Sequence, residues 1–147
     1  MTNLASATYG ASMLFATYEW FSPASRLLLP ESPVFIAYRF TNFGKWMDGW
    51  ESRRKRTPGH DCCILALGMR GAVDVMDVDT AFFMGNYPHN YDADAEIEFQ
   101  GLTASATRDR KMGTNATSKE IKLVERLKSL EWTEIISVTK LGAGWIP

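Results

Sequence analysis

The chain has 147 residues, the length of one ordinary domain with a single hydrophobic core. Apolar residues make up 46% and charged residues 22%, a balance typical of a folded globular protein and not of a disordered one. The net charge of -1 argues against nucleic acid as the main partner, because phosphate binding needs a large positive surplus. No run approaches the roughly 20 apolar residues of a membrane-spanning helix, so we expect no membrane partner either.

Short segments rich in β-branched and aromatic residues recur between turns along most of the chain. They lie at residues 13–17, 34–40, 62–67, 72–83, 97–100 and 133–139. This spacing predicts a mainly β fold, a sandwich of two sheets.

One substantial helix is predicted at residues 118–130, where apolar side chains recur at helical spacing with Lys and Glu between them. The apolar positions are Ile121, Val124, Leu127 and Leu130. Thr117, followed three residues later by Glu120, predicts a capping box at the start of this helix. Residues 102–115 have no strong period and carry several charges, so we expect an exposed loop there.

The only two cysteines, Cys62 and Cys63, are neighbours and cannot join distant segments. The pattern favours two reduced thiols on a strand. The alternative is a strained vicinal disulfide or a redox site.

The densest group of charged and aromatic residues runs from 44 to 61. Trp46 and Trp50 flank Asp48, and Glu51 and the basic run 53–56 follow. Two arrangements stay open: tryptophans that form pocket walls around the charges, or charges on the surface with the tryptophans packed beneath them.

The basic run contains three arginines, which favours forked recognition of a carboxylate or phosphate. A solvated basic face or a nuclear import signal is the alternative. His60 beside Asp61 could do acid/base work, although neighbours on a strand face opposite ways and a purely structural histidine is equally compatible with the pattern.

Asp77 and Asp79 alternate with apolar residues, so on a regular strand both carboxylates would leave the same face. Such a pair could share a proton or bind a cation. Because His60 and His89 are the only histidines, we predict no metal site and no cofactor. The chain contains no phosphate-binding glycine loop, nucleophile elbow or HExxH motif.

Several motifs of the sequence resemble the first repeat of the allantoicase family, and they occur in the same order. They are Phe-Ala-Thr at 15–17, FGKWMDGWESRRKR at 43–56, Pro-Gly-His-Asp at 58–61 and DVDTAFFMGNY at 77–87, with further likeness at 113–117 and 132–144. The likeness covers nearly the whole chain as a single repeat spanning residues 1–147. The motif at 43–56 is long and unusual, which makes the resemblance specific.

The resemblance implies a jelly-roll fold of the galactose-binding-like kind. It also implies hydrolysis of allantoate to ureidoglycolate and urea, as a step of purine degradation, with allantoate as the small-molecule partner. A homo-oligomer stays open. With no basic start typical of a secretory signal, we expect a cytoplasmic protein; the peroxisome is the alternative, although the chain has no C-terminal targeting tripeptide.

The substrate carries one carboxylate and two ureido groups, so we expect an arginine fork, an acid for the leaving nitrogen and a base for water. Arg53 and Arg54 are the predicted fork. Asp48 and Glu51 could hydrogen-bond the ureido N–H groups or serve as acid and base, with His60 as the alternative proton shuttle. The other predicted substrate-binding residues are Trp50, Asp77, Asp79 and Asn86. Residues 48–54 are therefore expected to line one shared concavity.

The chain departs from the family pattern at three places. Tyr18-Glu19 stands where an acidic pair is usual, and Cys62 where a tryptophan is usual. The chain ends before the closing strands and the second repeat, so we expect a C-terminally incomplete repeat. The rival prediction is an inactive jelly-roll domain that binds a ligand without turnover.

Overall fold

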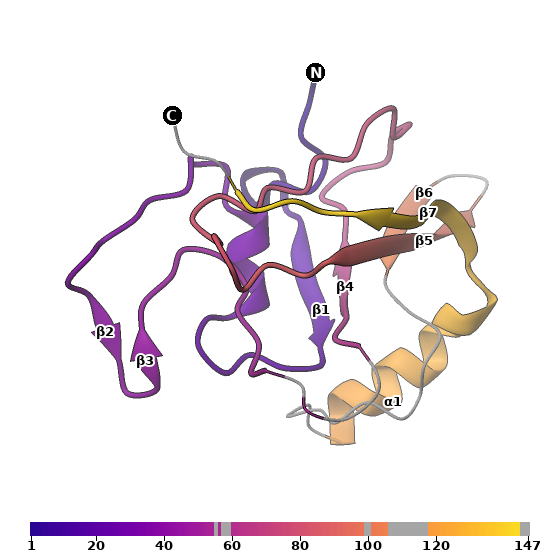
Figure 1. The fold of residues 1–147 in the computed structure, drawn as a ribbon. Coiled ribbons are helices and arrows are strands. Elements are labelled where there is room, and N and C mark those ends of the chain that lie inside the picture. Colours follow the sequence, from indigo (N-terminus) through magenta and orange to yellow (C-terminus); the bar gives the residue numbers. More distant parts are fainter. Residues whose placement is uncertain (55, 57–59, 99–100, 106–117, 145–147) are drawn as a thin grey trace.

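The computed structural model describes residues 1–54, 56, 60–98, 101–105 and 118–144. The described chain is mostly strand, with little helix (Figure 1). The strands are β1 (Ser12–Ala16), β2 (Phe40–Thr41), β3 (Gly44–Lys45), β4 (Cys63–Ala66), β5 (Asn90–Glu98), β6 (Gly101–Ser105) and β7 (Thr133–Lys140). The helices are α1 (Ser118–Leu127) and three short 3-10 turns, η1 (Ala7–Tyr9), η2 (Ala24–Leu28) and η3 (Ser129–Glu131).

Five strands form one antiparallel sheet in the order β1-β4-β6-β5-β7. The pairing of β1 with β4 runs from Ser12 opposite Ala66 to Ala16 opposite Cys63, with a register shift on the way. Residues far apart in sequence therefore pair at one edge of the sheet, where β1 is the outer strand.

The core of this sheet is built from β1, β4 and the segment after α1. Phe15, Cys62, Ile64 and Trp132 are buried together, and Ile64 is only 1% exposed. Val124 and Leu127 of α1 pack against this cluster, as their helical spacing predicts. The Trp132 indole N–H donates to the Leu127 carbonyl at 2.9 Å, so the end of the helix is fixed to the core.

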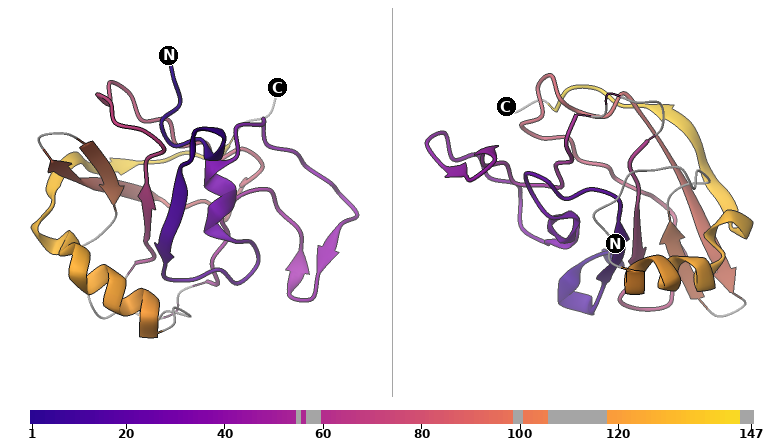
Figure 2. Two further views of the ribbon diagram at one scale, coloured as in Figure 1. Left: turned by 180° about the vertical axis from the view of Figure 1, so that it is seen from behind. Right: turned by 90° about the horizontal axis from the view of Figure 1, so that it is seen from below.

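A second, smaller unit projects from this body. Residues 29–47, here called the arm, leave η2, fold back as the two-stranded β2–β3 hairpin and return. Figure 2 shows the arm extending away from the five-stranded sheet on the side opposite α1. The arm is mostly irregular, and its hairpin has only two paired positions.

The predicted mainly β character with one helix is confirmed. Predicted strands at 13–17, 62–67 and 133–139 correspond to β1, β4 and β7, and the helix at 118–130 corresponds to α1 followed by η3. Residues 97 and 98 end β5. Residues 99–100 and Thr117, with its capping box, lie outside the described residues.

Three predictions about elements were wrong. Residues 72–83 form no strand, because their last residues form a local turn instead. In this turn Asp79 Oδ1 accepts from the Ala81 N–H at 2.7 Å, and the Phe83 N–H donates to the Thr80 carbonyl at 3.0 Å. Residues 34–40 are irregular up to Phe40. The predicted loop at 102–115 is wrong for residues 102–105, which belong to β6 and pair with β5, and residues 106–115 lie outside the described residues.

The neighbouring cysteines are both reduced thiols, as the favoured interpretation predicts. Burial raises the pKa of the Cys63 thiol to about 12, with smaller contributions from Cys62 and Glu19. Cys63 is therefore not placed to act as a thiolate nucleophile at neutral pH.

Among the described residues, no helix is both long and apolar enough to cross a membrane.

Candidate functional site

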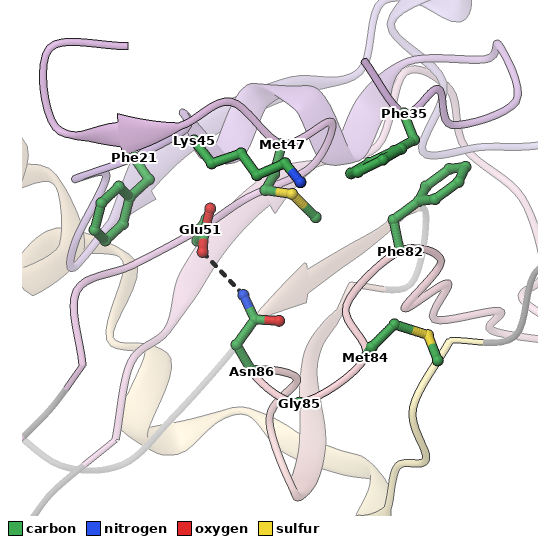
Figure 3. Close-up of a pocket in the computed structure, with 9 residues that line it drawn as sticks. All are labelled: Phe21, Phe35, Lys45, Met47, Glu51, Phe82, Met84, Gly85 and Asn86. Atoms are coloured by element: carbon green, nitrogen blue, oxygen red, sulfur yellow. Dashed lines mark hydrogen bonds between the residues drawn. The ribbon is translucent and has the colours of Figure 1, made fainter. Parts of the chain in front are cut away.

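A cavity of about 400 Å³ lies where the arm meets the turn that follows residue 80. Figure 3 shows its nine lining residues facing a common space. They are Phe21, Phe35, Lys45, Met47, Glu51, Phe82, Met84, Gly85 and Asn86. The walls are thus mainly aromatic and thioether side chains, with three polar side chains among them, which is the usual composition of a small-molecule site.

Glu51 is held in this cavity by its backbone. Its N–H donates to the Ser22 carbonyl at 3.3 Å, and its own carbonyl accepts from the Phe21 N–H at 3.1 Å, as an isolated antiparallel bridge. The two segments around residues 21 and 51 therefore fix where the carboxyl group starts.

The Glu51 carboxyl group has two unlike oxygens. Oε1 accepts from Asn86 Nδ2 at 2.9 Å, the contact drawn in Figure 3. Oε2 is buried and has no hydrogen-bond partner within the described part of the chain. Burial raises the pKa of Glu51 above its ordinary value, and the Asn86 hydrogen bond opposes that rise in part. Burial thus makes Glu51 a weaker acid than a carboxyl group in water, a direction that suits a proton donor.

Two aromatic rings wall the cavity where the arm faces the turn at residues 80–83. Phe35 and Phe82 stack with ring centroids 5.5 Å apart and planes 18° from parallel. The Lys45 Nζ lies 4.4 Å from the Phe35 centroid, a cation–π contact. Phe82 has a positive φ of 68°, so the turn that presents its ring is an uncommon backbone shape for a bulky residue.

Glycines let the backbone come close to this cavity. Gly44 has a φ of 147°, and a Cβ placed there would lie 3.2 Å from Phe21 Cε1. Gly49 has a φ of 143°, and a Cβ would lie 3.2 Å from Phe83 Cε2. Both positions therefore require glycine for backbone shape and for close packing.

Asp48 ties the arm to the body. Its Oδ1 accepts from Arg26 Nε at 2.8 Å and from Arg26 NH2 at 2.5 Å, and its Oδ2 accepts from the Val34 N–H at 2.9 Å. Both oxygens are engaged, and the side chain is 11% exposed. This contact fixes Val34, the residue before Phe35, so the structure gives Asp48 a positioning part.

Arg53 lies outside the cavity lining. Its guanidinium carbon is 5.3 Å from the Tyr18 ring centroid and 5.5 Å from that of Trp20, and its NH2 donates to the Tyr18 hydroxyl at 3.1 Å. The Trp50 indole N–H donates to the Tyr18 carbonyl. Arg54 is exposed. These three predicted substrate-binding residues therefore lie apart from the lining residues, although Glu51 is their close neighbour in sequence.

The remaining predicted residues also lie outside the cavity lining. His60 is exposed, and its neighbour Asp61 accepts from Thr17 at 3.1 Å and from Ser52 at 2.9 Å. Asp77 and Asp79 are exposed on an irregular segment, so the strand face expected to carry both carboxylates does not exist. Of all the predicted site residues, Glu51 and Asn86 are the two that line the cavity.

No cluster of three or more His, Cys, Asp or Glu able to hold a metal ion occurs among the described residues.

Sequence reasoning missed Lys45, Phe35 and Phe82. The sequence did carry a signal for two of them, because Lys45 lies inside the motif at 43–56 and Phe82 lies inside the motif at 77–87. Apart from Phe21 and Phe35, every lining residue belongs to one of these two motifs. Two separate motifs of the sequence therefore converge on one cavity.

The family model described as Allantoicase repeat matches residues 2–145. A probable allantoicase of Acinetobacter baumannii (strain ACICU) is 51% identical over 87 residues, 59% of this chain and 26% of that protein. The homologous protein of strain AYE is 49% identical over the same length. This chain thus matches about a quarter of the length of these curated relatives.

Two solved structures share the fold. A structure of allantoicase aligns over 96% of this chain and 36% of that chain, with a TM-score of 0.60 and 21% identity. The allantoicase of Saccharomyces cerevisiae aligns over 97% of this chain and 36% of its own, with a TM-score of 0.61 and 20% identity.

Proposed function

The chain belongs to the allantoicase family, and from this premise we propose that it is an allantoicase-like hydrolase whose reaction centre is the cavity at Glu51 and Asn86. The reaction proposed is allantoate plus water giving ureidoglycolate plus urea. Curated relatives that carry the name are about four times as long as the matched segment, so the activity of this chain is the proposal.

The observation that carries the proposal is that two motifs shared with the family line one cavity. Residues 43–56 and 77–87 supply all of its lining except two phenylalanines. Their contact point is the hydrogen bond from Asn86 to Glu51, across 35 positions of sequence. A motif used only for packing would have no need to bring a buried carboxyl group to an open cavity.

Glu51 supplies the proton chemistry in this mechanism. The C–N bond to one ureido group breaks, and the departing nitrogen keeps the electron pair and takes the proton of neutral Glu51, which releases urea. Water forms the new C–O bond and returns a proton to the Glu51 carboxylate, so the group is restored. The raised pKa of Glu51 supports the first step, because the acid must be protonated before the substrate reacts.

Asn86 and Asp48 have positioning parts in this proposal. Asn86 donates to Oε1 and so holds the Glu51 carboxyl group in place at the cavity. Asp48 is fully engaged by Arg26 and Val34, so we assign it the placement of the arm and assign the acid and base steps to Glu51.

For the fold, we propose the jelly-roll architecture of the galactose-binding-like kind. The antiparallel five-stranded sheet supports it, since a jelly roll is built from antiparallel strands.

A urea-release assay on the purified chain tests the function. We expect turnover of allantoate by the wild type and a loss of about 100-fold or more in kcat for Glu51→Gln, which keeps the shape and the amide contact but cannot donate a carboxyl proton. Glu125→Gln, on the exposed side of α1, is the matched control and should retain full activity.

Urea release by Glu51→Gln at the wild-type rate would refute the assignment of the reaction to this cavity. Saturable binding of allantoate with no urea release by the wild type would favour the rival function, a binding domain without turnover.

A further inference from the structure

Lys45 is the one cationic side chain among the cavity's lining residues. It ends the short strand β3, where it pairs with Phe40 of β2. Within the described part of the chain its ammonium group forms no ion pair, and it lies over the face of the Phe35 ring, 4.4 Å from the ring centroid. A lysine in that setting keeps hydrogen-bonding capacity for a ligand.

The other polar lining residues form no ion pair with Lys45. The single carboxyl group among the lining residues is Glu51, whose Oε1 accepts from Asn86 Nδ2 at 2.9 Å. The remaining polar side chain, Asn86, is uncharged. An anionic molecule that fills this cavity therefore meets the ammonium group of Lys45 without an ion-pair partner among the lining residues.

Three contacts fix the place of Lys45. Gly44 brings the preceding backbone against Phe21, where a Cβ would lie 3.2 Å from the ring. Asp48 holds Val34 by its backbone N–H, and the adjacent Phe35 ring stacks on Phe82 and lies under the ammonium group. The lysine is thus placed by the same elements that shape the cavity.

The arginine fork is the alternative anion site. Arg53 is held by Tyr18 and Trp20 and is not a lining residue, whereas Lys45 and Glu51 line one cavity. The geometry therefore favours the lysine.

We propose that Lys45 binds the carboxylate of the substrate, and that it makes the cavity selective for small organic anions that also carry amide-like N–H groups. Resting on the proposed function, this inference adds the residue that determines specificity. Glu51 and Asn86 face the ureido end of the molecule, and the Phe35–Phe82 pair lies beside the charge contact.

The test compares the affinities of the chain for allantoate and for its uncharged carboxamide by titration calorimetry. We expect the wild type to prefer allantoate about 10-fold to 100-fold, the range of one charged hydrogen bond. Lys45→Met should reduce this preference to near 1, and Lys45→Arg should keep most of it because the charge remains. Since both ligands are measured on the same sample, a fraction of misfolded protein cancels in the ratio.

Lys122→Met, which removes an exposed charge on α1, is the matched control and should keep the wild-type preference. The inference would be overturned if Lys45→Met kept the wild-type preference for allantoate over its carboxamide. It would also be overturned if Arg53→Met lost that preference instead. Absence of any preference in the wild type would overturn it as well.

The proposed function and this inference can fail separately. Turnover that depends on Glu51, with a preference independent of Lys45, refutes only the lysine. A preference that depends on Lys45, with no urea released by the wild type, refutes only the turnover.

Discussion

The five-stranded sheet and the cavity region are held together in different ways. In the sheet, backbone ladders join β1 to β4 and β5 to both β6 and β7, and they enclose a core in which Ile64 is 1% exposed. The cavity region, residues 18–51 and 80–87, is mostly irregular and depends on single contacts: Asp48 to Arg26 and Val34, Glu51 to Ser22 and Asn86.

This difference separates stability from function within one small domain. The stability of a strand ladder is distributed over many hydrogen bonds, so a single substitution on its surface should change the free energy of unfolding little. A cavity placed by a few side chains loses its geometry when one of them is removed. Changes in the core should therefore affect folding, and changes at the contacts around Asp48 and Gly44 should affect ligand binding more than folding.

Ile64→Ala should give the largest effect on stability. The side chain is fully buried between Phe15 and Trp132, so we expect a loss of about 2–5 kcal/mol in the free energy of unfolding, measured by urea denaturation. Val138→Ala on β7, where the side chain is 70% exposed, is the control and should change stability by less than about 0.5 kcal/mol. Equal losses in the two variants would erase the distinction between core and surface in the sheet.

Asp48→Ala should cost about 1–3 kcal/mol, since it leaves Arg26 and the Val34 N–H without their acceptor. It should also weaken allantoate binding, because Phe35 loses its support. The exposed pair Lys128–Glu131, with side chains 69% and 70% exposed, provides the comparison: Glu131→Ala should change stability by less than about 0.5 kcal/mol. If both variants behave alike, Asp48 does not tie the arm to the body.

Gly44→Ala should destabilise the chain by about 1 kcal/mol, because φ is 147° and the new Cβ would press on Phe21. The same change moves the strand that carries Lys45, so allantoate affinity should fall. Gly142→Ala, where nothing lies within 4 Å of the added Cβ, is the matched control. A fully active and fully stable Gly44→Ala would show that the arm tolerates a shift.

The smallest expected effect is a pH dependence of stability due to Glu51. Its pKa in the folded chain is raised above the ordinary value of 4.5, so the group's stabilising contribution is complete below pH 4.5. It is lost as the pH rises through the raised pKa, because the unfolded chain ionises more readily. The wild type should therefore lose stability relative to Glu51→Gln as the pH rises from 4.5. A difference that stays constant, or that grows in the opposite direction, would argue against burial of this carboxyl group.

The sequence predicted the sheet better than the cavity. The β-branched and aromatic residues at β1, β4 and β7 and the helical spacing of Val124 and Leu127 are local signals with a direct structural meaning. Residues 72–83 are also rich in such residues, but they pair with no neighbouring strand and end in the turn at Asp79. Local pattern alone cannot show whether a partner strand exists.

Two of the predicted site residues line one cavity of the described chain, and the others do not. Glu51 and Asn86 were named and do line one cavity, but the pairing that joins them spans 35 positions and has no local signal. Asp48 was predicted to do acid/base work, and its engagement by Arg26, 22 positions away, could not be read from the sequence. The roles of Trp50, Arg53, Arg54, His60, Asp77 and Asp79 in substrate binding or catalysis stay predictions.

The central claim is that the substrate occupies the cavity between the arm and the turn at residues 80–86. The most direct measurement is a titration of the isotope-labelled 147-residue chain with allantoate, followed by backbone amide NMR shifts. The account predicts the largest saturable shifts at Lys45, Glu51, Gly85 and Asn86, with little change in β5 and β7. Shifts that centre on Arg53 and Arg54, or on Asp77 and Asp79, while the cavity amides stay unmoved, would contradict it.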